Sequence, residues 1–223
     1  MSIPPKKTAV DLSEKTILLC GEYSKVFSFI INLISINNNR TLLILDDFNL
    51  RTMLSETGGL SINKLSGITV SKFESLVELD KALEHSEALL LNKSSFRLLV
   101  LGSLSNAYLR EISLHESSSY SNILYLLNKI LAFFSFLSKK YRCTGVLIGP
   151  SGDLNGSINI PAKRIFLYWV DYVLELHRCS IDGTVGELSE KTGEKTHLCI
   201  PLEGFKEISE IGECDEDACP RNV

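Results

Sequence analysis

The amino-acid sequence predicts an α/β protein with a mostly parallel central sheet. Short runs rich in aliphatic and β-branched residues recur along its 223 residues, and segments of helical length separate several of them. The runs are nearly continuous in apolar character, which is typical of strands that are covered on both faces. The predicted strands are 16–20, 41–45, 67–70, 97–101, 144–148, 170–176 and 196–200.

The carboxyl-terminal part of the sheet and one long helix complete this architecture. Gly183, Gly186 and Gly193 lie between the last two or three predicted strands, which we expect to form an antiparallel extension. The clearest helix is 119–141, which begins with a serine that can act as N-cap and ends with basic residues. Its apolar residues spread nearly round the cylinder, so it should be buried on more than one side. The second side is expected to lie either within the domain or against a partner subunit.

Three segments are predicted to be loops. They are 103–119, 149–164 and the tail from about 203. The second is rich in Gly, Ser and Asn and directly follows a predicted strand. In an open parallel sheet, loops at the carboxyl ends of strands are where ligands bind.

Composition excludes several classes of protein. The length fits one α/β domain, and no apolar run approaches the roughly 18 to 20 residues that span a bilayer, so an intracellular protein without a membrane segment or secretory signal is expected. The formal net charge of −4 gives no global basic field, so any DNA contact must come from a local patch or a shared surface. The six cysteines include no C-x-x-C pair and are interpreted as buried free thiols. Only Cys214 and Cys219, in the acidic tail, could pair or bind a metal.

The stretch GEYSKVFS stands where a phosphate-binding loop would follow the first predicted strand. A Walker A loop needs G-x-x-x-x-G-K-[ST], because its glycines turn backbone N–H groups toward the phosphates and its lysine neutralises them. These four positions are filled by Gly21, Val26, Phe27 and Ser28. Val26 is β-branched where conformational freedom is needed, and Phe27 has no charge. Lys25 lies two residues too early to replace the missing lysine.

The second nucleotide motif is altered as well. A Walker B strand ends in an acidic residue that holds Mg²⁺, but Gly102 stands at this position in RLLVLGS. Asp46 and Asp47 close the run TLLILDD and could place one carboxylate near the end of the sheet, although a helix N-cap is the favoured role. We therefore expect no nucleotide cofactor, no metal and no enzymatic activity.

The order of these motifs resembles that of the eukaryotic RecA-type recombinases, and especially of their non-catalytic paralogs. The recombinase phosphate loop reads G-E-F-R-T-G-K-T, and GEYSKVFS matches its opening Gly-Glu-aromatic before it departs. The family's strand ending in V-D-S resembles 101–103, and its next helix and strand, ending in I-T-N-Q-V, resemble 121–152. The stretch 161–178 resembles P-A-L-G-x-x-W-x-x-x-V-x-x-R-L-x-L-x-R, with one extra residue before Trp169, and 205–217 resembles the family's final strand.

The resemblance implies a RecA-like P-loop NTPase core, with its nucleotide motifs lost, over 15–205. An N-terminal extension would cover 1–14, and a C-terminal strand and acidic tail would cover 206–223. The small size looks most like a paralog of the Shu-complex type, an adaptor of the nucleus, with the cytoplasm as the alternative location, that promotes recombinase filament assembly on DNA in homologous recombination repair. The implied partners are other recombinase paralog subunits, a Shu-type zinc-binding partner, the recombinase filament and DNA.

The resemblance also implies where DNA would be bound. The family uses two loops at the carboxyl ends of central strands, which correspond to 104–119 and 151–163. The first holds Arg110, and the second leads into Lys163 and Arg164. Contacts from these side chains to phosphates would be independent of sequence and dependent on salt. The alternative is that Lys163 and Arg164 only solvate the start of a strand.

Two other functions remain open. One is a RecA-like subunit of the Elongator complex, which also lacks Walker motifs and serves transfer RNA modification. The other is an atypical ATPase, which retained nucleotide binding would distinguish.

Overall fold

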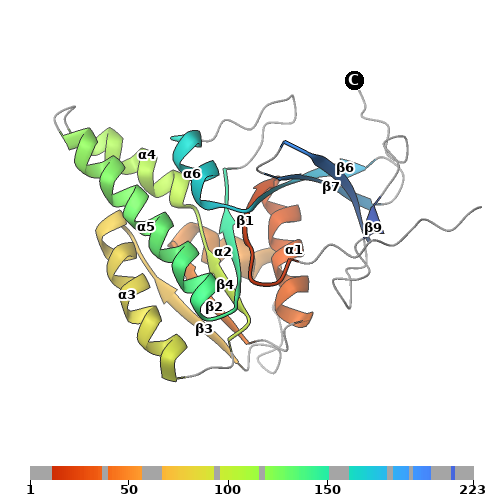
Figure 1. Cartoon of the computed structure of the whole chain (residues 1–223), viewed down its shortest axis with the longest axis horizontal. Coiled ribbons are helices and arrows are strands. Elements are labelled where there is room, and N and C mark those ends of the chain that lie inside the picture. Colours follow the sequence, from red (N-terminus) through yellow and green to blue (C-terminus); the bar gives the residue numbers. More distant parts are fainter. Residues whose placement is uncertain are drawn as a thin grey trace, which may run out of the picture.

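The computed structural model describes residues 12–36, 40–56, 67–92, 96–115, 119–150, 161–179, 183–190, 193–201 and 212–213. Within these residues, one mixed sheet has helices on both of its faces (Figure 1). Across the sheet the strands follow the order β3-β2-β4-β5-β1-β6-β7-β8-β9. Neighbouring strands are parallel from β3 to β6 and antiparallel from β6 to β9.

The bounds of the elements are as follows. The strands are β1 (Thr16–Gly21), β2 (Thr41–Leu45), β3 (Ile68–Lys72), β4 (Leu98–Leu101), β5 (Thr144–Ile148), β6 (Tyr172–Cys179), β7 (Gly183–Glu190), β8 (Lys195–Pro201) and β9 (Gly212–Glu213). The helices are α1 (Tyr23–Ile36), α2 (Asp47–Glu56), α3 (Leu76–Asn92), α4 (Leu104–Leu114), α5 (Tyr120–Lys140) and α6 (Lys163–Trp169).

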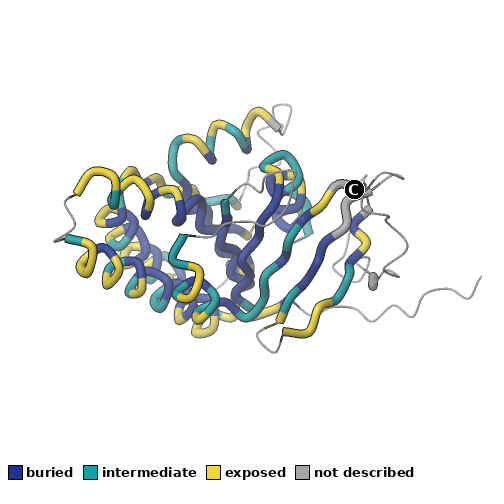
Figure 2. The backbone as a smooth tube through the Cα atoms, turned by 90° about the horizontal axis from the view of Figure 1, so that it is seen from above, coloured by how far each residue is buried: buried dark blue, intermediate teal, exposed yellow. Residues whose placement is uncertain are grey.

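An apolar core lies on each face of the sheet, because successive residues of a strand point to opposite faces. On one face, Phe27 of α1 and Met53 of α2 pack in the same cluster as Ile17 of β1. On the other, side chains of α3, α4, α5 and α6, such as Leu127, pack in the cluster that holds Leu18. The central strands are thus buried between helices whose outer surfaces are exposed (Figure 2). This double coverage explains why the strands are continuously apolar in sequence.

The predicted strands are confirmed, and so are the mostly parallel sheet and its antiparallel extension. The expectation that three glycines separate the last strands is wrong for two of them. Gly183 and Gly186 lie inside β7, where they pair with β6. A Cβ at Gly186 would come 2.8 Å from Leu174 Cδ1, so the buried Leu174 side chain would have to shift to accept a larger residue there. Gly193, with a φ of +88°, does lie between strands.

The predicted loop 103–119 is wrong, because most of it forms α4. The buried residues Leu104, Ala107 and Tyr108 lie three and four positions apart and form one face of this helix. In the sequence, neighbouring serines and a charged pair made this short helical periodicity hard to recognise. Of the predicted loop 149–164, residues 151–160 lie outside the described residues, and Lys163 already belongs to α6.

The long helix predicted over 119–141 is confirmed as α5. By length and composition it could cross a membrane, with a mean hydropathy of 1.3 over an 18-residue window, but 44% of that window is buried inside the protein. Leu127, Ile130 and Phe134 belong to the core. Its opposite side is exposed at Tyr125 (71%) and Phe136 (48%), so the helix covers the sheet and still presents aromatic rings to solvent.

The interpretation of the cysteines holds for two residues and fails for one. Cys20 and Cys143 are free and buried. Burial, with a smaller effect of the Glu175 charge, raises the pKa of the Cys20 thiol to about 12, and burial raises that of Cys143 to about 11. Cys199 instead forms a disulfide, whose partner cysteine is not among the residues with a described side chain.

Because thiolates and not thiols are alkylated, Cys20 and Cys143 should resist iodoacetamide at pH 8 in the folded protein. Peptide mass spectrometry is expected to find both residues unmodified in the native chain and fully modified after unfolding in guanidinium. Rapid modification of either residue without unfolding would show that its face of the sheet is open to solvent.

Candidate functional site

The turn after β1 is shorter than a phosphate-binding loop. β1 ends at Gly21 and α1 begins at Tyr23, so Glu22 alone lies between them. The backbone N–H groups of Lys25 and Val26 both donate to the Glu22 carbonyl oxygen, at 3.0 Å each. A Walker A loop directs N–H groups of this kind at the phosphates. Here the first turn of α1 uses them, so the backbone does not present them to an anion.

The side chains that align with the loop are distributed between the core and the surface. Val26 and Phe27, at the positions of the loop glycine and lysine, are 1% and 0% exposed, whereas Ser28 is exposed. The Phe27 ring stacks on Tyr23 with centroids 6.0 Å apart, and Tyr23 meets Phe48 of α2 edge-on at 5.5 Å. A cation at position 27 would therefore lie in the apolar core and not at the edge of the sheet.

Gly21, the one loop glycine that remains, is required by the packing of the sheet. It pairs with Leu176 of β6 and has a φ of +140°. A Cβ at this position would come 2.7 Å from the Leu176 carbonyl oxygen and 3.1 Å from Leu176 Cβ. Since backbone cannot move aside as a flexible side chain does, only glycine fits at this point.

We predict that Gly21→Ala destabilises the protein, although no nucleotide is needed for the effect. A residue forced into a sparsely populated backbone region costs about 1–3 kcal/mol, and the clash with β6 adds to that. Chemical denaturation should show the loss as a lower midpoint.

Gly193→Ala is the matched control, because Gly193 has a φ of +88° and nothing within 4 Å of its would-be Cβ. That variant should lose only the conformational part, roughly 1–2 kcal/mol. Equal losses in the two variants would refute the role of the Leu176 contact.

The position after β4, where a Walker B acid would stand, is also occupied by packing. A Cβ at Gly102 would come 2.7 Å from Leu45 Cδ2 and 3.4 Å from Asn49 Nδ2. Both neighbours are fully buried, so neither can yield cheaply. The Gly102 N–H donates to the Ile44 carbonyl oxygen at 2.9 Å. An acidic side chain at this point would have to displace packed residues.

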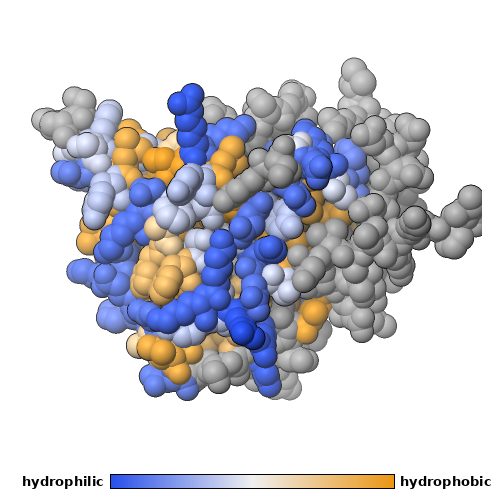
Figure 3. Space-filling model, viewed as in Figure 1, coloured by the Kyte–Doolittle hydropathy of each residue, from blue (hydrophilic) through white to orange (hydrophobic). Residues whose placement is uncertain are grey.

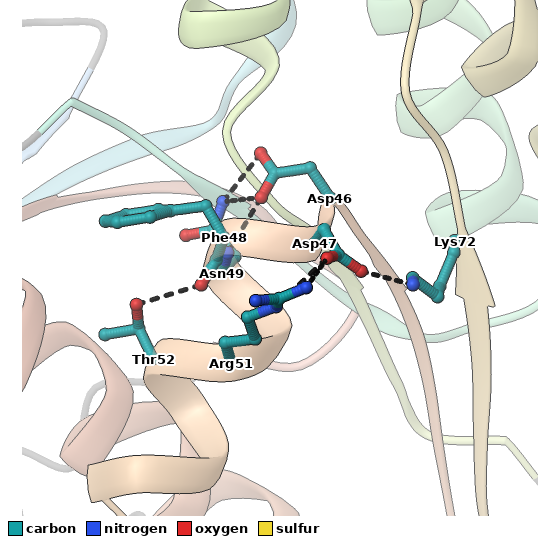
Figure 4. Close-up of polar contacts among 7 residues, drawn as sticks. All are labelled: Asp46, Asp47, Phe48, Asn49, Arg51, Thr52 and Lys72. Atoms are coloured by element: carbon teal, nitrogen blue, oxygen red, sulfur yellow. Dashed lines mark hydrogen bonds and ion pairs between the residues drawn. The ribbon is translucent and has the colours of Figure 1, made fainter.

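Asp46, the carboxylate nearest in sequence to the end of β2, caps α2 (Figure 4). The Asn49 backbone N–H donates to Asp46 Oδ1 at 2.7 Å, and Asn49 Nδ2 donates to Oδ1 at 3.0 Å and to Oδ2 at 2.9 Å. Asn49 is 0% exposed, and its own Oδ1 has no hydrogen-bond partner within the described part of the chain. Both oxygens of Asp46 are thus engaged in holding the helix start, as the preferred N-cap interpretation predicts.

Asp47 is held by cations on both sides (Figure 4). Its carboxylate pairs with Lys72 of β3 and with Arg51 one turn along α2, where Arg51 Nη2 lies 2.8 Å from Oδ2. The hydrogen bond from Lys72 and then that from Arg51 lower the pKa of Asp47. A lowered folded-state pKa contributes stability that is present above the unfolded carboxyl pKa of about 3.9 and is lost as the pH falls through the folded value. The group is exposed, so this contribution is small.

We predict a large difference between Asp46→Ala and Asp47→Ala. The first removes the cap and leaves the buried Asn49 amide without a partner, which should cost about 1–3 kcal/mol of unfolding free energy. The second removes ion pairs of an exposed carboxylate, which solvent screens, so its effect on stability should be much smaller. Urea denaturation at pH 7 measures both, and equal losses would contradict the capping role.

Side chains of α1 and α4 also meet at this edge of the sheet. Asn106 Nδ2 of α4 donates to Ser103 Oγ at 3.0 Å and to the Tyr23 hydroxyl at 3.3 Å. Ser103 is buried, in the left-handed region with a φ of 39°. Tyr23, Phe48 and Asn106 therefore link α1, α2 and α4 beside the altered turn. Sequence reasoning missed Phe48 and Asn106, because neither belongs to a motif with a recognisable spacing.

The three predicted DNA-binding cations lie on exposed positions of two helices. Arg110 is on α4, and Lys163 and Arg164 begin α6, so they do not precede a strand as the alternative interpretation held. Among the described residues, none of the three takes part in an ion pair. Lys163 is close enough to lower the pKa of Cys20, against the stronger effect of burial. This places it near the carboxyl end of β1.

Lys139 and Lys140, which could have extended such a patch, have acidic partners. Lys139 Nζ lies 3.3 Å from Asp171, and Lys140 Nζ lies 2.9 Å from Glu87. These two lysines therefore stabilise the packing around α5.

The described residues include no group of three or more His, Cys, Asp or Glu side chains placed to hold a metal ion. Comparison with known protein families and with curated proteins found no match to this sequence.

Proposed function

We propose that this chain is a non-catalytic, RecA-like recombinase paralog. It acts as an adaptor subunit of a Shu-type complex that promotes recombinase filament assembly on DNA in homologous recombination repair. The observation that carries the proposal is the start of α1 at Tyr23, which directs the Lys25 and Val26 N–H groups to Glu22 and buries Phe27. The strand–turn–helix arrangement of a phosphate site is present, but its parts serve packing.

The second nucleotide position supports the same proposal. Gly21 ends β1 and Gly102 follows β4; both lie at the carboxyl ends of parallel strands, with β5 between those strands. At both positions, neighbouring residues fill the space next to the glycine, where an active NTPase would hold nucleotide or metal. A protein that keeps this arrangement of strands and helices but lacks the nucleotide-binding residues is best suited to act through its surface.

An adaptor needs a surface for its partner, and the sheet offers one at β3. Among the described residues, β3 pairs only with β2. Backbone N–H and C=O groups along its other edge therefore make no hydrogen bonds to a strand within this part of the chain. Val70 in the middle of β3 is 46% exposed. Such an edge can accept an added strand from another chain. We assign this edge to an extended segment of a recombinase or paralog subunit.

The other expected partners follow from the same proposal. DNA would be contacted by Arg110, Lys163 and Arg164, through a surface completed by neighbouring subunits because the chain itself is acidic overall. A Shu-type zinc-binding protein would complete the complex. The place of action would be the nucleus.

Affinity purification of the tagged chain from its own cells, followed by mass spectrometry, tests this proposal. We expect recombinase paralogs, a Shu-type zinc-binding partner and the recombinase to co-purify. Val70→Lys should reduce recovery of the subunit bound at β3, because a charge on an edge strand opposes strand addition.

Val77→Lys is the matched control, since Val77 is 53% exposed on α3 and is not part of the β3 strand. It should leave recovery unchanged. Recovery of Elongator subunits, or a rise in thermal midpoint with ATP and Mg²⁺, would overturn the proposal in favour of tRNA modification or an ATPase.

A further inference from the structure

A disulfide lies at the antiparallel end of the sheet. Cys199 of β8 is disulfide-bonded and is exposed. Within the described part of the chain, the outer side of β8 pairs with β9, at the end of the sheet farthest from β3 (Figure 1). The cross-link therefore belongs to the surface of the protein and not to its core.

The partner of Cys199 follows from the cysteine count and from the strand order. The chain has six cysteines, of which Cys20 and Cys143 are free. The remaining candidates are Cys179, Cys214 and Cys219. Cys179 ends β6, and β7 lies between β6 and β8. Two strands on either side of a third are about 9.5 Å apart, which exceeds the roughly 7 Å between Cα atoms that a disulfide can bridge. The partner therefore follows β9 in the chain, outside the described residues.

The strand β9 is too short for its ladder alone to hold it on β8. Its two residues pair with Leu198 and Cys199, and residues 202–211 connect the two strands. Closing a connection of this length costs conformational entropy, and a ladder of two residues gives few hydrogen bonds in return. A covalent link lowers that cost because it keeps the chain close to β8. Since Cys199 itself pairs with Gly212, the disulfide acts where β9 meets β8.

The exposure of this disulfide makes it accessible to redox chemistry. The nucleus, where we propose that the chain acts, keeps thiols reduced, and disulfides in such compartments are usually transient and catalytic or redox-sensing. Exposed disulfides are also among the more easily reduced ones. Cys20 and Cys143 differ, because burial raises their pKa values to about 12 and about 11 and leaves them as unreactive thiols at neutral pH. Among the cysteine side chains that the structure describes, Cys199 is thus the one open to such chemistry.

The edge beside this disulfide is a surface that another chain could use. A free strand edge presents a row of N–H and C=O groups. Apolar side chains on the face seen in Figure 3 lie instead in separate groups between hydrophilic ones. The strand edge, and not an apolar patch on that face, is therefore the surface that a switch at Cys199 can control.

We propose that the Cys199 disulfide is a redox-sensitive clasp. When oxidised, it holds β9 on β8 and covers the middle of the outer edge of β8. When reduced, it releases β9 and leaves that edge open to pairing with another chain. The clasp goes beyond the adaptor function and does not require it, although the nucleus proposed above is taken as its setting.

The chemistry of the clasp balances with two classes of reagent. Opening takes two electrons and two protons from a dithiol reductant of the thioredoxin type. One thiolate of the reductant attacks a clasp sulfur, the other clasp sulfur leaves and takes up a proton, and the second thiol of the reductant releases the first sulfur as a thiol. The reductant ends as a disulfide. Closing uses a peroxide, which oxidises one clasp thiolate to a sulfenic acid and leaves as water; the second clasp thiol then attacks that sulfur and releases another water.

Peptide mapping of the full chain, purified without reductant, tests the connection. Trypsin places Cys199 in 196–206, both later cysteines in 207–221 and Cys179 in 179–191. We expect 196–206 and 207–221 to be joined, and reduced thioredoxin to separate them under native conditions. Peroxide added after the reductant has been removed should restore the link.

Hydrogen exchange measured by mass spectrometry tests the release of β9. After reduction with dithiothreitol, peptides that cover 197–200 and 212–213 should take up deuterium at least about fivefold faster, because the ladder between β8 and β9 is lost. Peptides of β4 and β5 should not change. Cys199→Ser should exchange like the reduced wild type in both redox states. Cys179→Ser is the matched control and should keep the link and its protection.

Four results would overturn the clasp. They are a Cys199 thiol that is free after purification without reductant, a link to 179–191, a link that resists reduced thioredoxin in the native chain, and exchange at β8 that is equal in the two redox states. The third would make the disulfide a permanent staple, and the fourth would show that β9 stays on β8 without it. All four are measured on the isolated chain, so the adaptor function is judged separately, by co-purification.

Discussion

The contact between Gly21 and the backbone of β6 is the constraint on which the rest of this structure depends. It brings the end of β1 so close to Leu176 that no side chain fits between them, and the chain must turn at once into α1. Because α1 starts there, its first N–H groups are directed to Glu22 and Phe27 falls on the face that packs on the sheet. One close approach between two strands thus determines what the turn can bind.

The other elements at this edge adapt to the same arrangement. The Tyr23 ring contacts the Phe48 ring edge-on, and the Tyr23 hydroxyl accepts a hydrogen bond from Asn106. Side chains therefore join α1, α2 and α4 beside the turn. Asp46 is occupied with Asn49 in the capping of α2.

Much of this fold could be predicted from the sequence, because continuous apolar runs such as 16–20 and 41–45 are typical only of strands buried on both faces. The helix α4 was missed because the apolar residues of its buried face are only three, Leu104, Ala107 and Tyr108, and they stand between Ser103 and a charged pair. The altered motif at Gly21 to Ser28 was visible, but the reason for Gly21 was not, since the contact with Leu176 spans most of the chain.

The pairing of β1 also has a consequence for how the chain reaches its native state. Both neighbours of this strand come late in the sequence, with Thr16 beside Gly145 of β5 and Ile17 beside Tyr172 of β6. During synthesis β1 must therefore wait until most of the protein has left the ribosome before its backbone can be paired. Long-range parallel pairing of this kind is slow, and the apolar segments of β1 and β2 stay unprotected in the meantime. Efficient production of this protein in a cell should accordingly depend on chaperones that shield its first strands until β6 arrives.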